Sequence, residues 1–131
     1  MEFIRKYCLL LLLFCVIPAG ANDLPAAKLT EVEARQLAQA ALGVHNRGAD
    51  LEATPRADDP DFYFFAVTWS NRVGSPVIGY FAVNPWTGDV WDRGCKRVRT
   101  AALRKLQAET RKRFALPPDA YRLLQAKMPL C

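Results

Sequence analysis

The chain has 131 residues and a formal net charge of +5, and 51% of its residues are hydrophobic. This length allows one domain with a single modest core and excludes a multidomain protein. No internal repeat, low-complexity tract, glycine-rich phosphate loop or metal-ligand spacing occurs in the sequence. These absences argue against repeat proteins, nucleotide-binding enzymes and zinc proteins.

The N-terminal segment predicts export. A positively charged start precedes an uncharged apolar run from Tyr7 to Ile17, which ends at Pro18 and three small residues. We interpret residues 1–21 as a cleaved signal peptide. The run is shorter than the ~20 residues of a membrane-spanning helix, so a retained anchor is the weaker alternative. Bulky residues before Cys15 argue against a lipoprotein.

Export leaves a single domain over residues 22–131, periplasmic or secreted, without stable membrane insertion. It also leaves two cysteines, Cys95 and Cys131. Such a pair in an oxidising compartment predicts one disulfide. The chain-entropy model gives a disulfide of this span a stabilising contribution on the order of 3–4 kcal/mol. The alternatives are two free thiols or a metal site. The metal site is the weaker alternative, because His45 is the only histidine in the chain.

Charge is distributed unevenly along the mature chain. From Asn22 to Asp92 there are five basic and ten acidic residues, whereas the segment 93–131 has eleven basic and two acidic residues. The basic segment predicts an acidic protein surface or an anionic envelope polymer as partner. Export argues against nucleic acid.

The segment from Leu29 to Gly43 predicts the first helix. Thr30 and Glu33 have the spacing of a capping box, and Gly43 is a C-terminal stop. A narrow face of small apolar residues at helical spacing would lie close on a sheet. Its members are Ala34, Leu37, Ala38 and Ala41.

Three runs rich in aromatic and β-branched residues predict an antiparallel meander: Phe62–Trp69, Val77–Val83 and Asp89–Asp92. Residues 70–76 form the first loop, and Asn84–Gly88 form a tight turn. The first run is apolar on both faces, so we expect it to be covered on both sides.

A short edge strand is also expected at Leu51–Thr54, before the meander. The acidic run Asp58–Asp61 has no calcium-loop spacing and is interpreted as a solvated turn. After the meander, Thr100 caps a second helix that ends near Phe114, and the Pro117–Pro118 pair breaks it. A third helix is expected from Asp119 to about Lys127. The predicted fold class is therefore α+β: an N-terminal helix packed on a small antiparallel meander, followed by two C-terminal helices.

The first helix, the paired strands and the phrase from Gly79 to Val90, which contains Asn-Pro-Trp-Thr-Gly, resemble a PepSY domain over roughly Leu29–Asp92. The resemblance implies an exported or membrane-attached, non-catalytic protein that inhibits a peptidase or has another envelope binding role. The basic helical part 93–131 with its two cysteines departs from that family's minimal pattern.

Catalytic chemistry is weakly supported by the sequence. His45 follows a predicted helix stop, and no local motif supplies a nucleophile or an orienting carboxylate for it. Cys95 and Cys131 lack the Cys-x-x-Cys spacing of redox enzymes. We therefore expect a non-enzyme without cofactor or metal, and a redox or hydrolytic enzyme is the weakest of three hypotheses.

Two features are candidate binding sites. Trp86 lies at a turn tip, where a large apolar side chain either meets a partner or packs against the C-terminal helices. A cluster of basic residues on the second helix could steer an acidic protein, although such a run is often only a solvated face. Its members are Arg104, Lys105, Arg111, Lys112 and Arg113.

The leading hypothesis is a protein that blocks an envelope enzyme by steric occlusion, as a protease inhibitor or as an immunity protein against a toxin. The occluding element would be the hairpin tip Asn84–Gly88 or the basic helix. The alternative is an envelope structural or ligand-binding module that engages anionic polymer or lipid through its basic helices.

Overall fold

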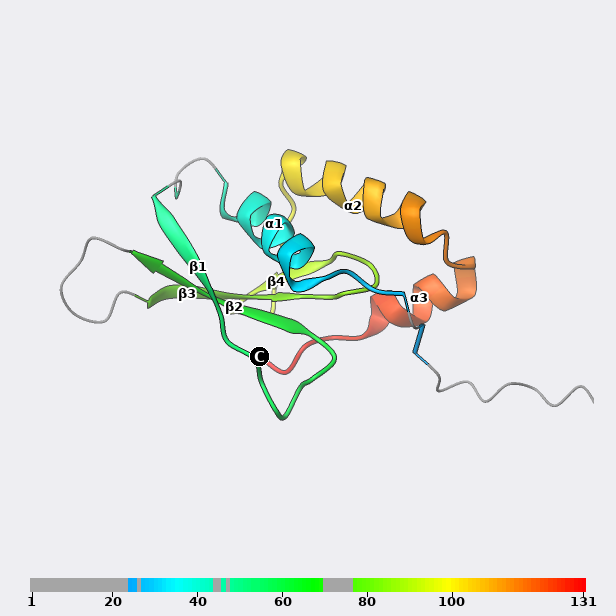
Figure 1. Cartoon of the computed structure of the whole chain (residues 1–131), viewed down its shortest axis with the longest axis horizontal. Helices are drawn as coiled ribbons and strands as arrows, with labels where there is room; N and C mark the ends of the chain where they lie inside the picture. The colour runs from blue at the N-terminus through cyan, green and yellow to red at the C-terminus, as the bar shows by residue number, and fades with distance from the viewer. Residues whose placement is uncertain (1–23, 26, 44–45, 47, 70–76) are drawn as a thin grey trace, which may run out of the picture.

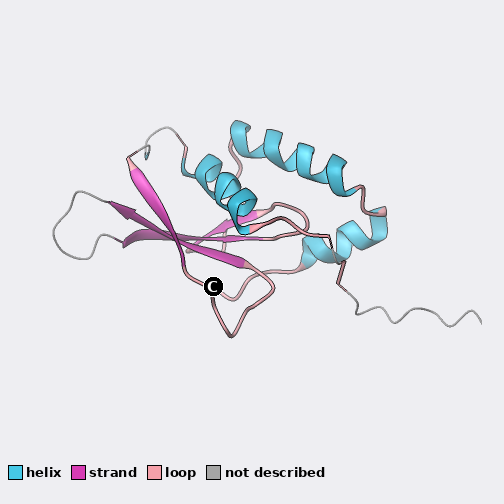
Figure 2. Ribbon diagram, in the orientation of Figure 1, coloured by secondary structure: helices cyan, strands magenta, loops and turns pink. Residues whose placement is uncertain are grey.

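The computed structural model describes residues 24–25, 27–43, 46, 48–69 and 77–131. The elements and their order confirm the predicted α+β class (Figures 1 and 2). They are α1 (Glu31–Leu42), β1 (Ala49–Ala53), β2 (Tyr63–Trp69), β3 (Val77–Val83), β4 (Val90–Asp92), α2 (Ala101–Phe114) and α3 (Pro118–Ala126).

The four strands form one antiparallel sheet in the order β1-β2-β3-β4, so the expected meander and the edge position of β1 are both confirmed. Phe65 of β2 lies opposite Phe81 of β3, and this register is interrupted once, by a bulge near Val67 and Thr68. Successive side chains along each strand point to opposite faces of the sheet. The sheet has two covered faces, and they are built differently.

The first is the helix-covered face, where α1 and α2 lie on the same side of the sheet (Figure 1). The capping box predicted at Thr30 and Glu33 is present, and the helix stop Gly43 has a positive φ of 68°. Ala34 and Ala38 are fully buried, because small side chains let α1 approach the strands closely. Phe65 and the first half of α2 complete this core.

The second is the tail-covered face, which carries a smaller cluster of Phe62, Phe64, Ala82 and Trp91. It lies on the side of the sheet where the chain ends (Figure 1). The C-terminal tail, defined as residues 127–131, is held there by the loop between β1 and β2. Both faces of β2 are thus covered, as its sequence predicted.

The C-terminal helices follow the prediction closely. Thr100 caps α2 through a hydrogen bond from the N–H of Leu103, and α2 ends at Phe114 before the left-handed residue Ala115. Pro118 occupies the start of α3, where the missing N–H costs nothing, so α3 spans Pro118–Ala126 and not Asp119–Lys127.

The predicted signal peptide, His45 and the loop 70–76 lie outside the described residues. Within the part of the chain that is described, no helix is both long and apolar enough to cross a membrane.

Candidate protein-binding surface

The outer face of α2 carries a group of exposed positive charges. The inner face of α2 carries its two buried residues, Leu103 and Thr110. The Thr110 hydroxyl donates a hydrogen bond to the Leu106 carbonyl of the same helix. Four exposed cationic residues lie on the opposite side, in two rows of i, i+7 spacing that flank the small residue Ala108. The rows are Arg104 with Arg111 and Lys105 with Lys112.

None of these four side chains forms an ion pair with another described residue. The guanidinium of Arg111 lies 4.3 Å from the centroid of the Tyr121 ring, which orients it without neutralising it. Cations in the last turn of α2 also interact favourably with the helix dipole. The surface is therefore a pre-positioned patch of positive charge on a buried scaffold.

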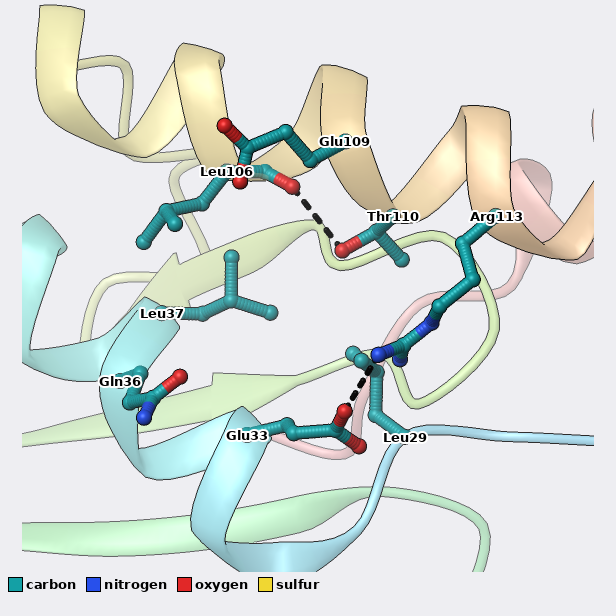
Figure 3. A pocket seen from close by; sticks show the side chains of 8 residues that line it. All are labelled: Leu29, Glu33, Gln36, Leu37, Leu106, Glu109, Thr110 and Arg113. Atoms are coloured by element: carbon teal, nitrogen blue, oxygen red, sulfur yellow. Dashed lines mark hydrogen bonds and ion pairs between the residues drawn. The ribbon is translucent and has the colours of Figure 1, made fainter.

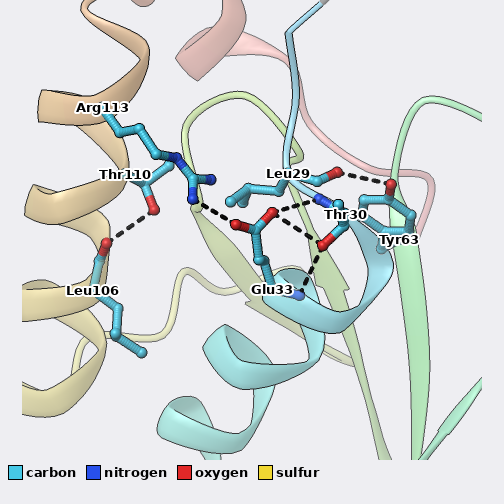
Figure 4. A network of polar contacts seen from close by, with 7 residues as sticks. All are labelled: Leu29, Thr30, Glu33, Tyr63, Leu106, Thr110 and Arg113. Carbon is cyan, nitrogen blue, oxygen red and sulfur yellow. Dashed lines mark hydrogen bonds and ion pairs between the residues drawn. The ribbon is translucent and has the colours of Figure 1, made fainter.

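The fifth residue of the predicted cluster, Arg113, is not part of this patch. It reaches from α2 across to Glu33 on α1 and forms an ion pair there (Figure 3). The same carboxylate accepts hydrogen bonds from the N–H and hydroxyl of Thr30, at 2.8 Å and 3.0 Å (Figure 4). Arg113 first, and the Thr30 N–H second, lower the pKa of Glu33 to about 2.

This network lies at the rim of a hollow of about 280 Å³ between α1 and α2 (Figure 3). Leu29, Leu37 and Leu106 provide its apolar lining, and Gln36 and Glu109 are among its polar residues. The Leu29 carbonyl accepts a 2.8 Å hydrogen bond from the Tyr63 hydroxyl of β2 (Figure 4). The ion pair of Glu33 and Arg113 thus joins two helices and a capped helix start, which is a structural role.

The turn Asn84–Gly88 is not an exposed tip. The Asn84 side-chain oxygen accepts the N–H groups of Trp86 and Thr87, and its amide donates to the Leu124 carbonyl of α3. Gln107 of α2 donates to the Gly88 carbonyl, so the turn lies beneath the C-terminal helices. Of the two occluding elements considered above, the hairpin tip Asn84–Gly88 is buried within the chain, because the residues that make the turn tight also contact the C-terminal helices.

Trp86 is only 3% exposed. Its indole N–H donates to the Pro25 carbonyl at 3.0 Å, and the Lys127 ammonium lies 5.5 Å from the ring centroid. Of the two interpretations of its sequence position, packing within the chain is the one that this burial supports.

Cys95 and Cys131 are bonded to each other across 36 residues, as predicted. The acidic turn before β2 meets the same tail: Asp59 accepts the Leu130 N–H, and Asp61 pairs with Lys127 at 2.8 Å. These carboxylates thus bind the tail and are less solvated than the sequence suggested. No group of three or more metal-ligating side chains occurs among the described residues.

Sequence reasoning missed one surface feature, the exposed first half of β3. Val77, Ile78 and Tyr80 are 38%, 46% and 42% exposed, and the sequence had predicted only that they belong to a strand of the meander. Strand length could have indicated this exposure. β4 has three residues and β3 has seven, so β4 is too short to pair along all of β3.

No family model matches this chain, and no curated protein matches it. The resemblance to PepSY domains therefore stays a prediction. Among solved structures, the chain is similar to one from a type VI secretion system effector-immunity complex of Pseudomonas protegens. The TM-score is 0.60 with 23% sequence identity, over 75% of this chain and 87% of that chain. At this identity, the similarity is one of fold.

Proposed function

We propose that this chain is an exported immunity-type inhibitor, which binds a toxic or proteolytic enzyme in the periplasm and blocks it sterically. The observation that carries the proposal is the fold shared with a chain from an effector-immunity complex, over most of both chains. The polar network that we found between α1 and α2 is an internally satisfied ion pair, consistent with a binding protein.

The contact surface that we propose is the basic face of α2, formed by Arg104, Lys105, Arg111 and Lys112. Four cations without internal ion partners among the described residues suit an acidic patch beside the active site of the target. Such a surface accelerates association by electrostatic steering and selects against basic proteins. Because α2 is anchored by buried Leu103 and by Gln107, whose side chain donates to the Gly88 carbonyl, it presents these charges with little conformational cost.

The test is neutralisation of a toxic or proteolytic enzyme that the mature chain captures from envelope extract. Both proteins are directed to the periplasm of a test bacterium, and survival is measured with and without this chain. We expect rescue of growth and a complex of the two purified proteins. Toxicity that is unchanged by this chain, together with no measurable complex, would show that the proposed function is wrong.

A matched pair of variants locates the surface. Lys105→Glu/Lys112→Glu reverses two charges on the basic face, whereas Lys28→Glu/Arg122→Glu reverses two exposed charges elsewhere. Both change the net charge equally. We expect the α2 variant to bind the enzyme about ten- to a hundredfold more weakly and the control to bind within about twofold of the unchanged protein. Equal weakening by both variants would move the contact surface away from α2.

A second candidate function rests on the same unpaired cations, which also suit an anionic polymer or lipid head groups. Vesicles with and without anionic lipid test it. Binding to the anionic vesicles that falls steeply between low and physiological salt would support this alternative. Binding to the enzyme but not to the vesicles would reject it.

A further inference from the structure

The hollow between α1 and α2 lies directly beside the lysine row of α2, formed by Lys105 and Lys112. Leu106 and Glu109 are among the residues that line the hollow from α2 (Figure 3). Glu109 follows Lys105 by four positions and precedes Lys112 by three, so these three residues lie along one side of the helix. A partner that contacts the lysine row therefore also covers the mouth of the hollow.

The polar residues that line the hollow do not need a polar occupant. Arg113 pairs with Glu33, and the Thr110 hydroxyl donates to a carbonyl of its own helix (Figures 3 and 4). The other two, Gln36 and Glu109, are exposed and can stay in contact with water at the rim. An apolar side chain in the hollow therefore leaves no buried donor or acceptor unpaired.

The floor of the hollow is apolar and has the size of one large side chain. Leu29, Leu37 and Leu106 supply the floor, and the hollow measures about 280 Å³. Sites for small molecules usually measure about 300–1,000 Å³, so this hollow is below that range. It suits a single anchoring side chain of a protein better than a cofactor.

The outer ridge of α1 beside the hollow consists of uncharged residues. Val32, Gln36 and Gln39 are exposed, and their spacing of four and three positions places them along one side of the helix. Val32 is 65% exposed, although it is apolar. The hollow thus has a basic rim on α2 and an uncharged rim on α1.

We propose that the hollow receives one apolar side chain of the partner enzyme, from a segment whose carboxylates pair with Lys105 and Lys112. The segment places its uncharged side on Val32. The two lysines are seven residues, or ~10 Å, apart along the helix axis, and Leu106 and Glu109 lie between them. Carboxylates on both sides of the apolar residue match this arrangement, and this charge complementarity selects the occupant.

This inference rests on the proposed function for the identity of the partner, so its first test uses three matched synthetic peptides. The probe is acetyl-Glu-Glu-Leu-Glu-Glu-amide, and the comparison peptides have serine or lysine at the central position. Each is titrated into the disulfide-bonded protein purified from the periplasm. At millimolar peptide, we expect NMR resonances of Lys105 and Lys112 to shift with the leucine and serine peptides. Only the leucine peptide should shift the methyl groups of Leu37 and Leu106.

The relative affinities of the three peptides decide the chemistry of the occupant. The leucine peptide should bind about five- to tenfold more tightly than the serine peptide, because it buries an apolar side chain. Equal binding of these two peptides, without shifts of the Leu37 and Leu106 methyl groups, would show contact with the lysine row alone and would overturn the inference. Tightest binding of the lysine peptide would show that Glu109 recruits a cation and would overturn it as well.

Variants of the hollow give the second test, with the captured enzyme. Gln36→Trp places a large side chain at the hollow, whereas Leu123→Trp introduces the same residue on α3, where Leu123 is 68% exposed. We expect Gln36→Trp to weaken the complex about tenfold and Leu123→Trp to leave it within about twofold. Val32→Lys should also weaken binding. Tighter binding by Val32→Lys would place carboxylates over α1 and contradict the proposed orientation.

The outcomes separate this inference from the proposed function. If the enzyme is inhibited and Gln36→Trp binds it as tightly as the unchanged protein does, the inference fails and the function stands. If the leucine peptide enters the hollow but no captured enzyme is inhibited, the function fails and the hollow stands as a binding site.

Discussion

The two faces of the sheet are covered by different means. On the helix-covered face, α1 and α2 bury a continuous apolar core that includes Phe65, Val83 and Leu103, all 0% exposed. On the tail-covered face, four buried residues form the cluster, and links distant in sequence hold the tail over it. Those links are the disulfide, the bonds of Arg56 and Asp59 to Leu130, and the Lys127–Asp61 ion pair.

This one domain therefore combines two sources of stability. The helix-covered face depends on the area of apolar surface removed from water. The tail-covered face depends more on constraining the chain, because its cover is a short segment with exposed residues such as Met128 and Leu130.

The largest effect is expected on the helix-covered face. Phe65→Ala should lower the free energy of unfolding by about 3–5 kcal/mol, since it removes a fully buried ring and leaves a cavity. Urea denaturation followed by circular dichroism measures this. Tyr80→Ala, on the exposed half of β3, is the control and should cost less than about 1 kcal/mol. Equal losses for the two variants would contradict the assignment of the core.

Loss of the disulfide should be the largest single effect on the tail-covered face. Cys131→Ser opens a loop whose ends are 36 residues apart, and the chain-entropy model gives a loss of about 3–4 kcal/mol. Hydrogen exchange should increase in the tail and at residues 54–61 while α1 stays protected. Uniformly increased exchange, α1 included, would show that the two faces are not independent.

A double-mutant cycle sharpens the comparison. Phe64 and the tail residues Leu130 and Cys131 line the same hollow, whereas Phe65 faces the helices. Phe64→Ala should therefore couple to Cys131→Ser by about 1 kcal/mol, and Phe65→Ala should be additive with it within about 0.5 kcal/mol. Denaturant midpoints of the single and double variants give both values. Coupling of the same size at both positions would contradict the division.

The smallest effect concerns the Glu33 network. Because the folded pKa of Glu33 is about 2, against an ordinary value of 4.5, its contribution is complete above pH 4.5 and is lost as the pH falls toward 2. Glu33→Gln should cost about 1 kcal/mol at pH 7, since solvent screens this partly exposed ion pair. It should cost less as the pH falls. Burial raises the pKa of Asp89, so its effect on stability has the opposite pH dependence. The measurement is therefore the difference in unfolding free energy between Glu33→Gln and the unchanged protein at each pH.

Much of the fold could be predicted from the sequence because its signals are local. The capping box at Thr30, the cap at Thr100 and the Pro117–Pro118 pair each act within one helical turn. The structure has these helices within one or two residues of their expected bounds. The cysteine pairing followed from counting, since the predicted signal peptide takes two of the four cysteines and leaves a single pair. The three strands of the meander were also predicted correctly, because aromatic and β-branched content between turn residues is a local property of the sequence.

The candidate site could be predicted only in part. Five cations of α2 were grouped by sequence, but their partners decide their roles, and Arg113 is taken by Glu33 from a distant helix. The sequence left two interpretations of Trp86 open, contact with a partner or packing against the C-terminal helices, and the burial of its turn beneath those helices supports packing. The exposed half of β3 depends on where β4 stops, which the disulfide-linked turn determines.

Spacing along the chain was enough to predict the α+β class, the element order and the disulfide. Tertiary contacts determine which cations of α2 lack ion partners among the described residues, which turn is buried and how far β4 pairs along β3. Those properties depend on residues far apart in sequence meeting in space, and no local pattern records such meetings.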